Sequence, residues 1–492
     1  MKRKLVIITI IFTCFLLICI LGEVSLQIVD PDFGWHLTVG RLIVAKGIPK
    51  TDPFSYTMPS YPFVDHEWLT NVGIAYLYPR IGFIGLSILF TLLAYFSLLL
   101  QLPLLLKKWT PIPFILGISA LVTYMGIRPQ IISWVLFSFL LVILLQEKLW
   151  KKLRFFLPLL FLIWVNLHGG FALGIVALGI ALVIKVWGTK KIQIGDWIIF
   201  ALCIAATFCN PYTYRIWWEV WVSLSDTSLH WSILEWFPTL FMFNFGLIAL
   251  LPLSAILVFL NRKQFSVVEL VLYVALLVFG LSSSRNAPFW IILALPITVR
   301  AIVYFYEQTK AIPGATARFN KAYIFYLIFV MVGSSWQVLS PLLAYKINTN
   351  ASFYPQQAMV YLQKHPSSGQ MFSEYDWGGY LIWKLPEKKV FIDGRMPSWR
   401  REATNSYESK YAFRDYQDIF TGKLSFASIV KKYNIDTVLV RSARITNKPT
   451  QLEILEKIFV INPPNLDFQT LMREVKMEIV YKDRTSVIYR KK

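Results

Sequence analysis

Cysteines and charged side chains are both scarce in this sequence. The 492 residues include only four cysteines, Cys14, Cys19, Cys203 and Cys209, and all four lie within apolar runs. This placement excludes a disulfide framework or a cysteine-ligated zinc site in the polar parts of the chain. Charged residues make up 16% of the chain and hydrophobic residues 56%, which excludes an ordinary soluble surface.

Several catalytic and binding motifs are also missing. The sequence contains no glycine-rich phosphate loop, no Ser/His/Asp triad spacing and no His-Glu-x-x-His pair. The polar stretches on one side of the apolar runs are too short to form a nucleotide-binding domain. The sequence therefore predicts no domain that would bind a nucleotide-linked substrate.

Long apolar runs predict a polytopic α-helical membrane protein. A run of about 20 apolar residues crosses the hydrocarbon core as a helix, and by this measure the chain has about eleven transmembrane helices. The predicted spans are residues 5–25, 82–106, 111–127, 131–147, 154–168, 170–187, 195–210, 239–260, 265–282, 286–305 and 321–342. Several are short enough that a re-entrant or tilted half-helix is an alternative.

The distribution of basic residues predicts the orientation of these spans. With the amino terminus in the cytoplasm, 18 of the 25 Lys and Arg residues before position 345 fall on the inner side, where such residues gather. The net charge of +21 then mostly reflects the orientation of the protein in the membrane, so it requires no nucleic-acid partner. We expect a multi-pass protein of the plasma membrane with a cytoplasmic amino terminus and an extracytoplasmic carboxyl terminus.

The chain is predicted to divide near residue 345 into a transmembrane domain (1–344) and a soluble extracytoplasmic α/β domain (345–492). The second part has ordinary soluble composition, with alternating strand-like and helical patterns. Strands are expected at Tyr380–Trp383, Val390–Ile392, Thr437–Val440, Glu478–Tyr481 and Ser486–Tyr489. Helices are expected at Pro355–Lys364 and Phe426–Tyr433.

Two outer segments are predicted to lie against the membrane surface. The first outer loop (28–80) carries short amphipathic helices around Trp35–Lys46 and Asp65–Tyr78, the second capped by Asp65. The segment 212–237 is rich in tryptophan, which prefers the headgroup level, so we expect an interfacial helix there. That helix would either support a lipid substrate or serve as a plain anchor.

Here the sequence resembles a known family. An outward first loop with two juxtamembrane helices, and an acidic residue just after the first span, is the plan of the GT-C glycosyltransferases. Asp30-Pro31-Asp32-Phe33-Gly34-Trp35-His36 is similar to the first-loop pattern of the oligosaccharyltransferase catalytic subunit, with His36 where that family usually has Arg. Tyr375-Asp376-Trp377-Gly378-Gly379-Tyr380 looks like the acceptor motif of the same family, with one extra glycine.

The resemblance implies a membrane glycosyltransferase of GT-C type, moving a sugar from a polyprenyl-phosphate donor to an unknown extracytoplasmic acceptor. Such transfer needs a base for the incoming hydroxyl and stabilisation of the departing phosphate. Asp30 is favoured as the base by alignment and Asp32 by its proximity to His36. The alternative for both is helix capping and turn formation. Asp376 and Trp377 would contact the acceptor.

Other residues carry weaker predictions. His66 and Glu67 would orient the base or complete a metal site. Asp30, Asp32 and Glu67 together would suit Mg²⁺ or Mn²⁺, although no cofactor is certain. Capping and interfacial hydrogen bonding remain the alternative for these residues.

Basic residues at outer span ends are candidates for binding the donor. Arg128 and Arg285 stand alone there and would bind the lipid phosphate, the alternative being snorkelling. His168, beside Gly169-Gly170, is a further candidate that a close helix turn would explain equally well. Asp393 and Arg395 would meet an acceptor or close over the first loop, although a plain Asp-Gly turn is an equal alternative.

Two other classes of function stay open at this stage. A transporter or lipid-glycan flippase would carry ionisable residues or broken helices near the membrane midplane, and often two repeated halves. A non-catalytic scaffold for envelope assembly would leave the acidic loop without a purpose. Neither sugar nor acceptor follows from the sequence, and one membrane architecture can host several chemistries.

Overall fold

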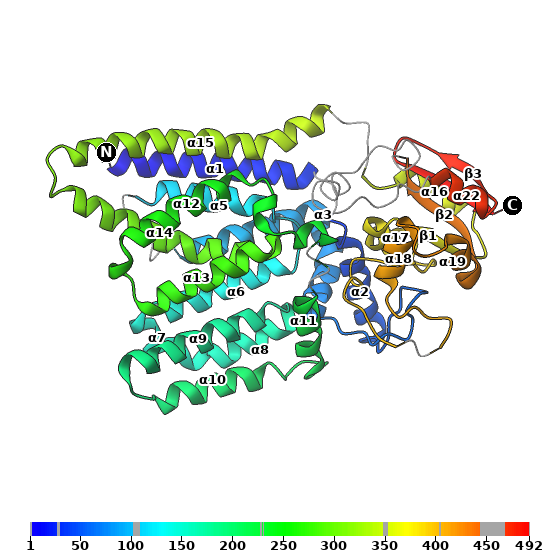
Figure 1. Ribbon diagram of the computed structural model, residues 1–492, viewed down its shortest axis with the longest axis horizontal. Coiled ribbons are helices and arrows are strands. Elements are labelled where there is room, and N and C mark those ends of the chain that lie inside the picture. The colour runs from blue at the N-terminus through cyan, green and yellow to red at the C-terminus, as the bar shows by residue number, and fades with distance from the viewer. Residues whose placement is uncertain are drawn as a thin grey trace.

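A computed structural model of the protein describes residues 2–26, 30–101, 109–226, 229, 231–347, 353–402, 405–442 and 468–491. An elongated bundle of helices forms one end of the molecule and a small α/β region forms the other (Figure 1). Helix α2 and the first part of α3 lie where the two regions meet.

Every apolar run that was predicted to span the membrane coincides with a helix. The prediction for 82–106 extends past the end of α3, and its last residues, 102–106, lie outside the described part of the chain. The helices of the bundle are α1 (Lys2–Leu26), α3 (Trp68–Leu99), α5 (Pro111–Val122), α6 (Gln130–Leu144), α7 (Glu147–Leu153), α8 (Leu157–Leu167), α9 (Phe171–Thr189), α10 (Ile194–Ala206), α12 (Phe245–Leu260), α13 (Val267–Ser282), α14 (Ala287–Thr309) and α15 (Ala315–Ile347).

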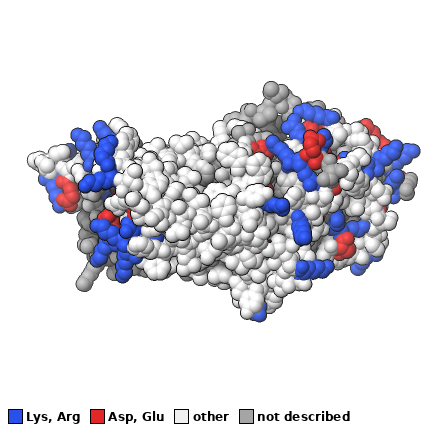
Figure 2. All heavy atoms as spheres, turned by 90° about the horizontal axis from the view of Figure 1, so that it is seen from below, with Lys and Arg blue, Asp and Glu red and all other residues white. Residues whose placement is uncertain are grey.

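The bundle has the character of a membrane domain. Among the described residues, four helices are long and apolar enough to cross a membrane, and a pair bent by 109° at residues 144–147 would make a fifth. Figure 2 shows charged side chains gathered at the two ends of the molecule, with an almost uncharged face between them. The protein is therefore a membrane protein, whereas the count of about eleven spans stays a prediction because the other apolar helices are shorter.

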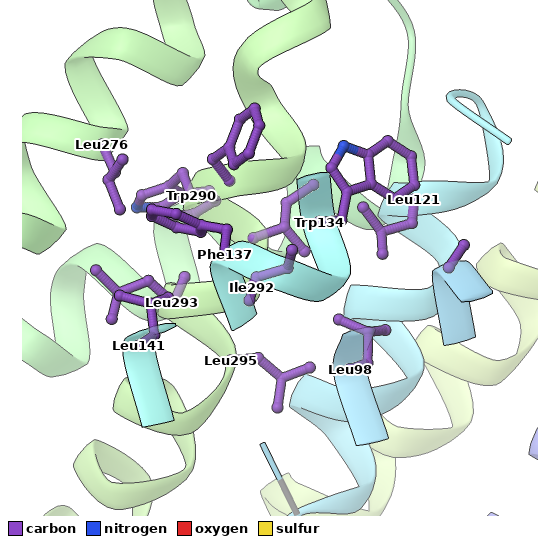
Figure 3. Packing of buried hydrophobic residues seen from close by; sticks show 14 of the residues in the cluster. Leu98, Leu121, Trp134, Phe137, Leu141, Leu276, Trp290, Ile292, Leu293 and Leu295 are labelled. Carbon is purple, nitrogen blue, oxygen red and sulfur yellow. The ribbon is translucent and has the colours of Figure 1, made fainter. Parts of the chain in front are cut away.

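The core of the bundle is built around α14. This helix buries most of its residues, including Trp290 and Leu293, because almost every position along it is apolar. Trp134 and Phe137 of α6 pack against it, as Figure 3 shows. An all-round apolar helix at the centre of a bundle is expected to be buried on every side.

The first outer loop forms α2 (Phe33–Lys46), followed by an irregular stretch and then α3. The predicted first helix is confirmed. The second begins at Trp68 rather than Asp65 and continues as α3 through a bend at Gly82, whose φ is 65°. Asp65 does not cap it in the predicted way, because its carboxylate accepts from the backbone N–H of Glu67, before the helix begins.

The α/β region contains a four-stranded sheet in the order β1-β2-β4-β3. β1 and β2 are parallel, whereas β4 is antiparallel to both β2 and β3. The strands are β1 (Gln370–Ser373), β2 (Ile435–Arg441), β3 (Met477–Lys482) and β4 (Ser486–Lys491). The helices of this region are α16 (Gln356–Lys364), α17 (Gly378–Lys384), α18 (Ala412–Phe420), α19 (Phe426–Tyr433) and α22 (Phe468–Glu474).

Two of the predicted strands are wrong. Tyr380–Trp383 lies within helix α17, which packs against α2, so an apolar run of strand-like residues is buried as a helix. Val390–Ile392 is not a strand, although Val390 forms a single parallel bridge with Ser55 of the first loop. The other three predicted strands and both predicted helices are confirmed, whereas β1 was missed.

The segment 212–237 is helical only in part. Its described residues include α11 (Arg215–Ser225) and a short turn at Leu234–Trp236. Trp218 and Trp221 of α11 are 65% and 64% exposed. Large exposed indole rings on a short helix are typical of a surface at the lipid headgroup level.

The two regions meet at backbone contact distance through glycines. A Cβ added at Gly34 of α2 would overlap the carbonyl oxygen of Gly379 in α17, and one added at Gly379 would overlap the carbonyl oxygen of Pro31. Only glycine lets the two backbones approach this closely. This contact fixes the acidic loop against the α/β region.

Gly34→Ala is therefore expected to destabilise the protein by about 1–3 kcal/mol, because α2 and α17 must move apart. Thermal unfolding of the detergent-solubilised protein, followed by tryptophan fluorescence, measures this. Gly73→Ala is the control, since Gly73 lies in α3 with nothing within 4 Å of an added Cβ. An equal effect of both substitutions would contradict the tight contact.

Candidate functional site

A cleft opens where the helical bundle, the first outer loop and the α/β region converge. Its empty space is about 910 Å³, a volume that includes the solvent at its open mouth. Carboxylates, imidazoles and guanidinium groups line it together with tryptophan rings. The polar lining residues include Asp30, Asp32, His36, Asp65, His66, Glu67, Arg128, Glu219, Glu235, Arg285 and Arg395.

Asp30 belongs to a network of ion pairs at one side of the cleft. Arg128, in the loop between α5 and α6, places its Nε 2.5 Å from Asp30 Oδ2 and its second amino group 2.6 Å from Glu235 Oε1. The carboxylates raise the pKa of Arg128 further above its ordinary value, overcoming the opposite effect of burial. The guanidinium group of Arg128 is therefore occupied by two protein carboxylates, and Asp30 is one of these ion-pair partners.

Asp32 has a different environment from Asp30. Its Oδ1 accepts a hydrogen bond of 2.8 Å from Trp35 Nε1, and it packs directly against Gly394 of the α/β region. Burial raises the pKa of the Asp32 carboxyl to about 7, and the negative charges of Asp30 and Glu235 add to the effect. A carboxylate with such a pKa can exchange a proton near neutral pH.

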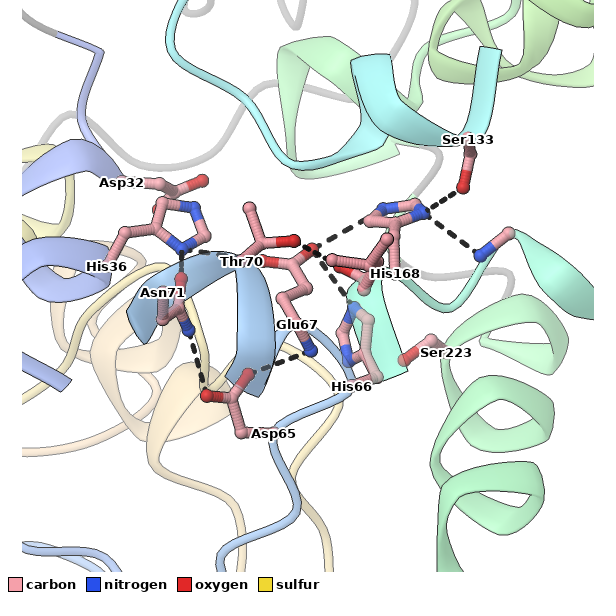
Figure 4. A network of polar contacts seen from close by, with 12 residues as sticks. Asp32, His36, Asp65, His66, Glu67, Thr70, Asn71, Ser133, His168 and Ser223 are labelled. Atoms are coloured by element: carbon pink, nitrogen blue, oxygen red, sulfur yellow. Dashed lines mark hydrogen bonds and ion pairs between the residues drawn. The ribbon is translucent and has the colours of Figure 1, made fainter. Parts of the chain in front are cut away.

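His36 is held in one tautomer by its neighbours. Asn71 donates from Nδ2 to Asp65 Oδ2 at 2.8 Å, which turns Asn71 Oδ1 toward His36 Nδ1 at 2.7 Å (Figure 4). His36 Nδ1 must therefore carry a proton, leaving the lone pair on Nε2. Burial lowers the pKa of His36, so the ring is neutral at pH 7, and burial also raises the pKa of Asp65, to about 6.

Glu67 lies among three imidazole rings just before α3. Its Oε1 is 3.2 Å from His66 Nε2 and 3.4 Å from His168 Nε2, and its Oε2 is 3.4 Å from His36 Nδ1. Burial alone would raise the pKa of Glu67, but the charge of the adjacent His66 and a hydrogen bond from it lower this pKa well below its usual range. Glu67 is thus ionised although it is only 4% exposed.

The imidazole rings of His66 and His168 differ in their protonation. Burial lowers the pKa of His168 to about 3, so this ring is neutral. Burial also opposes protonation of His66, but the adjacent Glu67 carboxylate outweighs it and raises the pKa of His66. The opposite shifts follow from the neighbouring charges, because Asp65 and Glu219 also raise the pKa of His66, whereas His66 and Arg285 lower that of His168.

Arg285 offers a positive charge on the opposite wall. It lies in the turn before α14, 5.4 Å above the ring of Trp236, and lines the cleft. Among the described residues no carboxylate forms a salt bridge with it. Both arginines predicted to bind phosphate thus reach the cleft, but only Arg285 has its guanidinium group available.

Arg395 ties the α/β region to the first loop. It lies 2.8 Å from Asp52 Oδ1 and forms a bidentate pair with Asp393, at 2.7 and 2.6 Å. Arg395 lines the cleft, whereas Asp393 is completely buried. The Asp-Gly-Arg segment therefore closes over the first loop, which was one of the predicted alternatives.

Some predicted residues are not brought to the cleft. Trp377 is completely buried and donates from Nε1 to the carbonyl oxygen of Phe353, while Asp376 pairs with Arg441. Glu67 groups with His66 and His168 rather than with Asp30 and Asp32 as a set of metal-ligating side chains. Asp376 and Trp377 of the acceptor-like motif therefore make contacts within the α/β region.

Other residues in or beside the cleft were missed. Glu235 and Asn71 were not singled out, because a lone carboxylate in an aromatic segment and a helical asparagine are unremarkable in sequence. The pairing of Asp52, in the first outer loop, with Arg395 was not predicted either. Each acts through a partner that is distant along the chain.

No family model matches the sequence, and no curated protein matches it. Two solved structures of the oligosaccharyltransferase of Archaeoglobus fulgidus resemble the fold. The apo form has a TM-score of 0.55 and 10% sequence identity, with 89% of this chain and 70% of that chain covered. The form tethered to an acceptor peptide with the NVT sequon has a TM-score of 0.53, with the same identity and coverage.

At this level of identity the likeness concerns the fold. The predicted resemblance to the GT-C oligosaccharyltransferases is confirmed in the arrangement of the helices and in most of the chain's length. One architecture hosts several chemistries, so the reaction has to be argued from the cleft.

Proposed function

We propose that the protein is an integral membrane glycosyltransferase that moves a sugar from a polyprenyl-phosphate donor to an acceptor on the outer face of the membrane. The observation that carries this proposal is the pairing of a proton-accepting carboxylate with an available cation in one cleft. Asp32 has a pKa of about 7, and Arg285 lines the same cleft without a carboxylate partner among the described residues. The cleft is lined by residues of the first outer loop and of the turns that flank the apolar helices, so the isoprenoid tail of a donor would lie along those helices.

The transfer step uses these groups in distinct roles. Asp32 accepts the proton of the acceptor's nucleophilic group as that group bonds to the anomeric carbon. The bond between that carbon and the phosphate oxygen breaks, and the electron pair leaves with the polyprenyl phosphate. Arg285 stabilises the phosphate charge. Arg128 is a positioning residue that holds Asp30 and Glu235 beside the base.

The proposal requires a defined place in the membrane. We assign a cytoplasmic amino terminus, about eleven spans within 1–344 and an extracytoplasmic domain at 345–492, in the plasma membrane, on the distribution of Lys and Arg. The exposed Trp218 and Trp221 would lie at the outer headgroup level. A lipid donor could then reach the cleft laterally from the bilayer while the acceptor arrives from water.

The direct test is transfer by the purified protein in liposomes. Radiolabelled polyprenyl-phosphate sugars are supplied with cell-envelope extract or with a peptide containing Asn-Val-Thr, since the structural neighbour was crystallised with such a sequon peptide. Transfer to either acceptor that depends on the protein supports the proposal. Absence of transfer from every polyprenyl-phosphate sugar, to both acceptors, contradicts it.

Arg285→Ala is expected to weaken binding of the polyprenyl-phosphate sugar by about 10- to 100-fold, because a charge-assisted hydrogen bond contributes about 1.5–3 kcal/mol. Isothermal titration in detergent micelles measures the affinity. Arg215→Ala is the control, since Arg215 is exposed at the start of α11 and does not line the cleft. Unchanged affinity in Arg285→Ala would assign this residue to the membrane interface alone.

A further inference from the structure

His66, Glu67 and His168 have the spacing of ligands around one metal ion. Four ligands that each lie about 2.0–2.1 Å from a tetrahedral zinc ion are about 3.3 Å from one another. Glu67 Oε1 lies 3.2 Å from His66 Nε2 and 3.4 Å from His168 Nε2. One ligand atom from each of the three residues falls within 4.8 Å of the others. The side chains converge on one point in Figure 4.

Two of these groups also lack the partners that burial demands. Glu67 and His168 are 4% and 8% exposed, yet Glu67 Oε2 and His168 Nε2 have no hydrogen-bond partner among the described residues. Buried polar atoms without a partner are rare in native proteins and often indicate an ion or an ordered water. We propose that His66, Glu67 and His168 bind a divalent zinc ion, a site that goes beyond the proposed transfer reaction and does not depend on it.

The contacts of His168 Nδ1 determine what metal binding at Nε2 requires. Ser133 Oγ lies 2.7 Å from His168 Nδ1 and also accepts from Trp164 Nε1 at 2.7 Å. With a metal at Nε2, the ring would carry its proton on Nδ1 and donate it to Ser133, an outer-shell contact typical of histidine ligands. In the metal-free protein the backbone N–H of Gly170 donates to Nδ1 at 2.9 Å, which places the proton on Nε2. Metal binding therefore changes the tautomer of this ring and releases the Gly170 N–H.

The neighbouring groups define the limits of the site. His36 Nδ1 is 3.4 Å from Glu67 Oε2, but it donates to Asn71 and so is not a ligand. Two imidazole nitrogens and one carboxylate favour zinc over magnesium, which prefers oxygen ligands. His66 and Glu67 line the cleft, whereas His168 lies behind them. The fourth coordination position is therefore on the cleft side, open to water or an anionic oxygen, as in catalytic zinc sites.

The experiment is zinc binding by the full-length protein, purified in detergent with a histidine-free tag. Metal is removed with a chelator, Zn²⁺ is titrated, and bound zinc is measured by mass spectrometry, with Co²⁺ absorption as a probe of tetrahedral geometry. We expect about one zinc ion per chain. His66→Ala and His168→Ala should each raise the apparent Kd by at least about 100-fold. His66→Ala is the key variant, because the His66 side chain is 31% exposed and its loss leaves the core intact.

His365→Ala and Asp30→Asn are the matched controls. His365 is exposed on the α/β region, and Asp30 belongs to the carboxylate set that would suit Mg²⁺ or Mn²⁺. Both should bind zinc like the unmodified protein, with the same elution volume in size-exclusion chromatography. The site is overturned if the unmodified protein binds no zinc, or if His66→Ala and His168→Ala bind it undiminished. Loss of zinc in Asp30→Asn alone would place the ion elsewhere in the cleft. Because the readout is metal content, its failure would leave the transfer reaction standing.

Discussion

Replacing Asp32 with asparagine is expected to lower kcat for sugar transfer by about 10²- to 10⁴-fold, the usual contribution of a general base. Asparagine keeps the shape of the side chain and the hydrogen bond from Trp35 Nε1, so the fold should be retained. The amide cannot accept the acceptor's proton at neutral pH. The measurement is single-turnover transfer in liposomes, with the donor affinity determined separately by titration.

The pH dependence of the unmodified protein provides the second readout for Asp32. Because the base must be ionised, kcat/KM should rise with pH through about 7, the pKa of Asp32, and level off above it. The groups that set this pKa are Asp30 and Glu235, which raise it, and Arg128, which lowers it. Tyr375 and Tyr354 also face the carboxylate, and burial keeps both phenols protonated in this range.

The variant Asp30→Asn distinguishes the role of Asp30 from that of Asp32. It removes one partner of Arg128 and one negative charge beside Asp32, so the pH profile should shift to lower pH while much of the activity is retained. Full activity in Asp32→Asn, or a profile that is flat from pH 6 to pH 8, would contradict the assignment. Loss of activity in His36→Gln together with an active Asp32→Asn would move the base to His36 Nε2.

The apolar helices could be predicted from the sequence because their signal is local. A run of about 20 apolar residues needs no knowledge of its neighbours to be assigned as a helix. Tyr380–Trp383 shows where this fails, since four large apolar residues suit either a buried strand or a buried helix. The glycines at positions 378 and 379 start α17 here, where an added Cβ would overlap Ile392 and Asp393 at Gly378 and the carbonyl oxygen of Pro31 at Gly379.

The cleft was predictable as a set of residue types but not as a set of contacts. Asp30, Asp32 and Arg128 were all singled out, yet the ion pair between Asp30 and Arg128 joins residues 98 positions apart. Glu67 and His168 are similarly separated by a long stretch of chain, so their spacing carries no local pattern. The pKa of Asp32 depends on burial and on Glu235, and both arise only after the loop has packed between the two regions.

Arg395→Met is expected to destabilise the protein by about 3–5 kcal/mol, because it leaves two buried carboxylates without a counter-charge. Asp52 and Asp393 side chains are 0% exposed and that of Arg395 is 5% exposed. Water cannot take over the role of the guanidinium group at such depth. Thermal unfolding in detergent should show a decrease of roughly 10 °C. The Arg395 guanidinium also stacks over Phe54 and Trp399, and methionine preserves part of that apolar contact.

Arg414→Met is the matched control, since Arg414 forms an exposed pair with Asp418 at 3.3 Å in the same region and should contribute less than about 1 kcal/mol. The triple variant Asp52→Asn, Asp393→Asn, Arg395→Met should recover part of the stability, because no charge is then left buried alone. Comparable losses for the Arg395 and Arg414 variants would contradict this account. Gly394, between Asp393 and Arg395, packs against Asp32, so Arg395→Met should also lower kcat below its unfolding temperature. That loss would follow from a displaced base, and donor affinity should change much less than kcat.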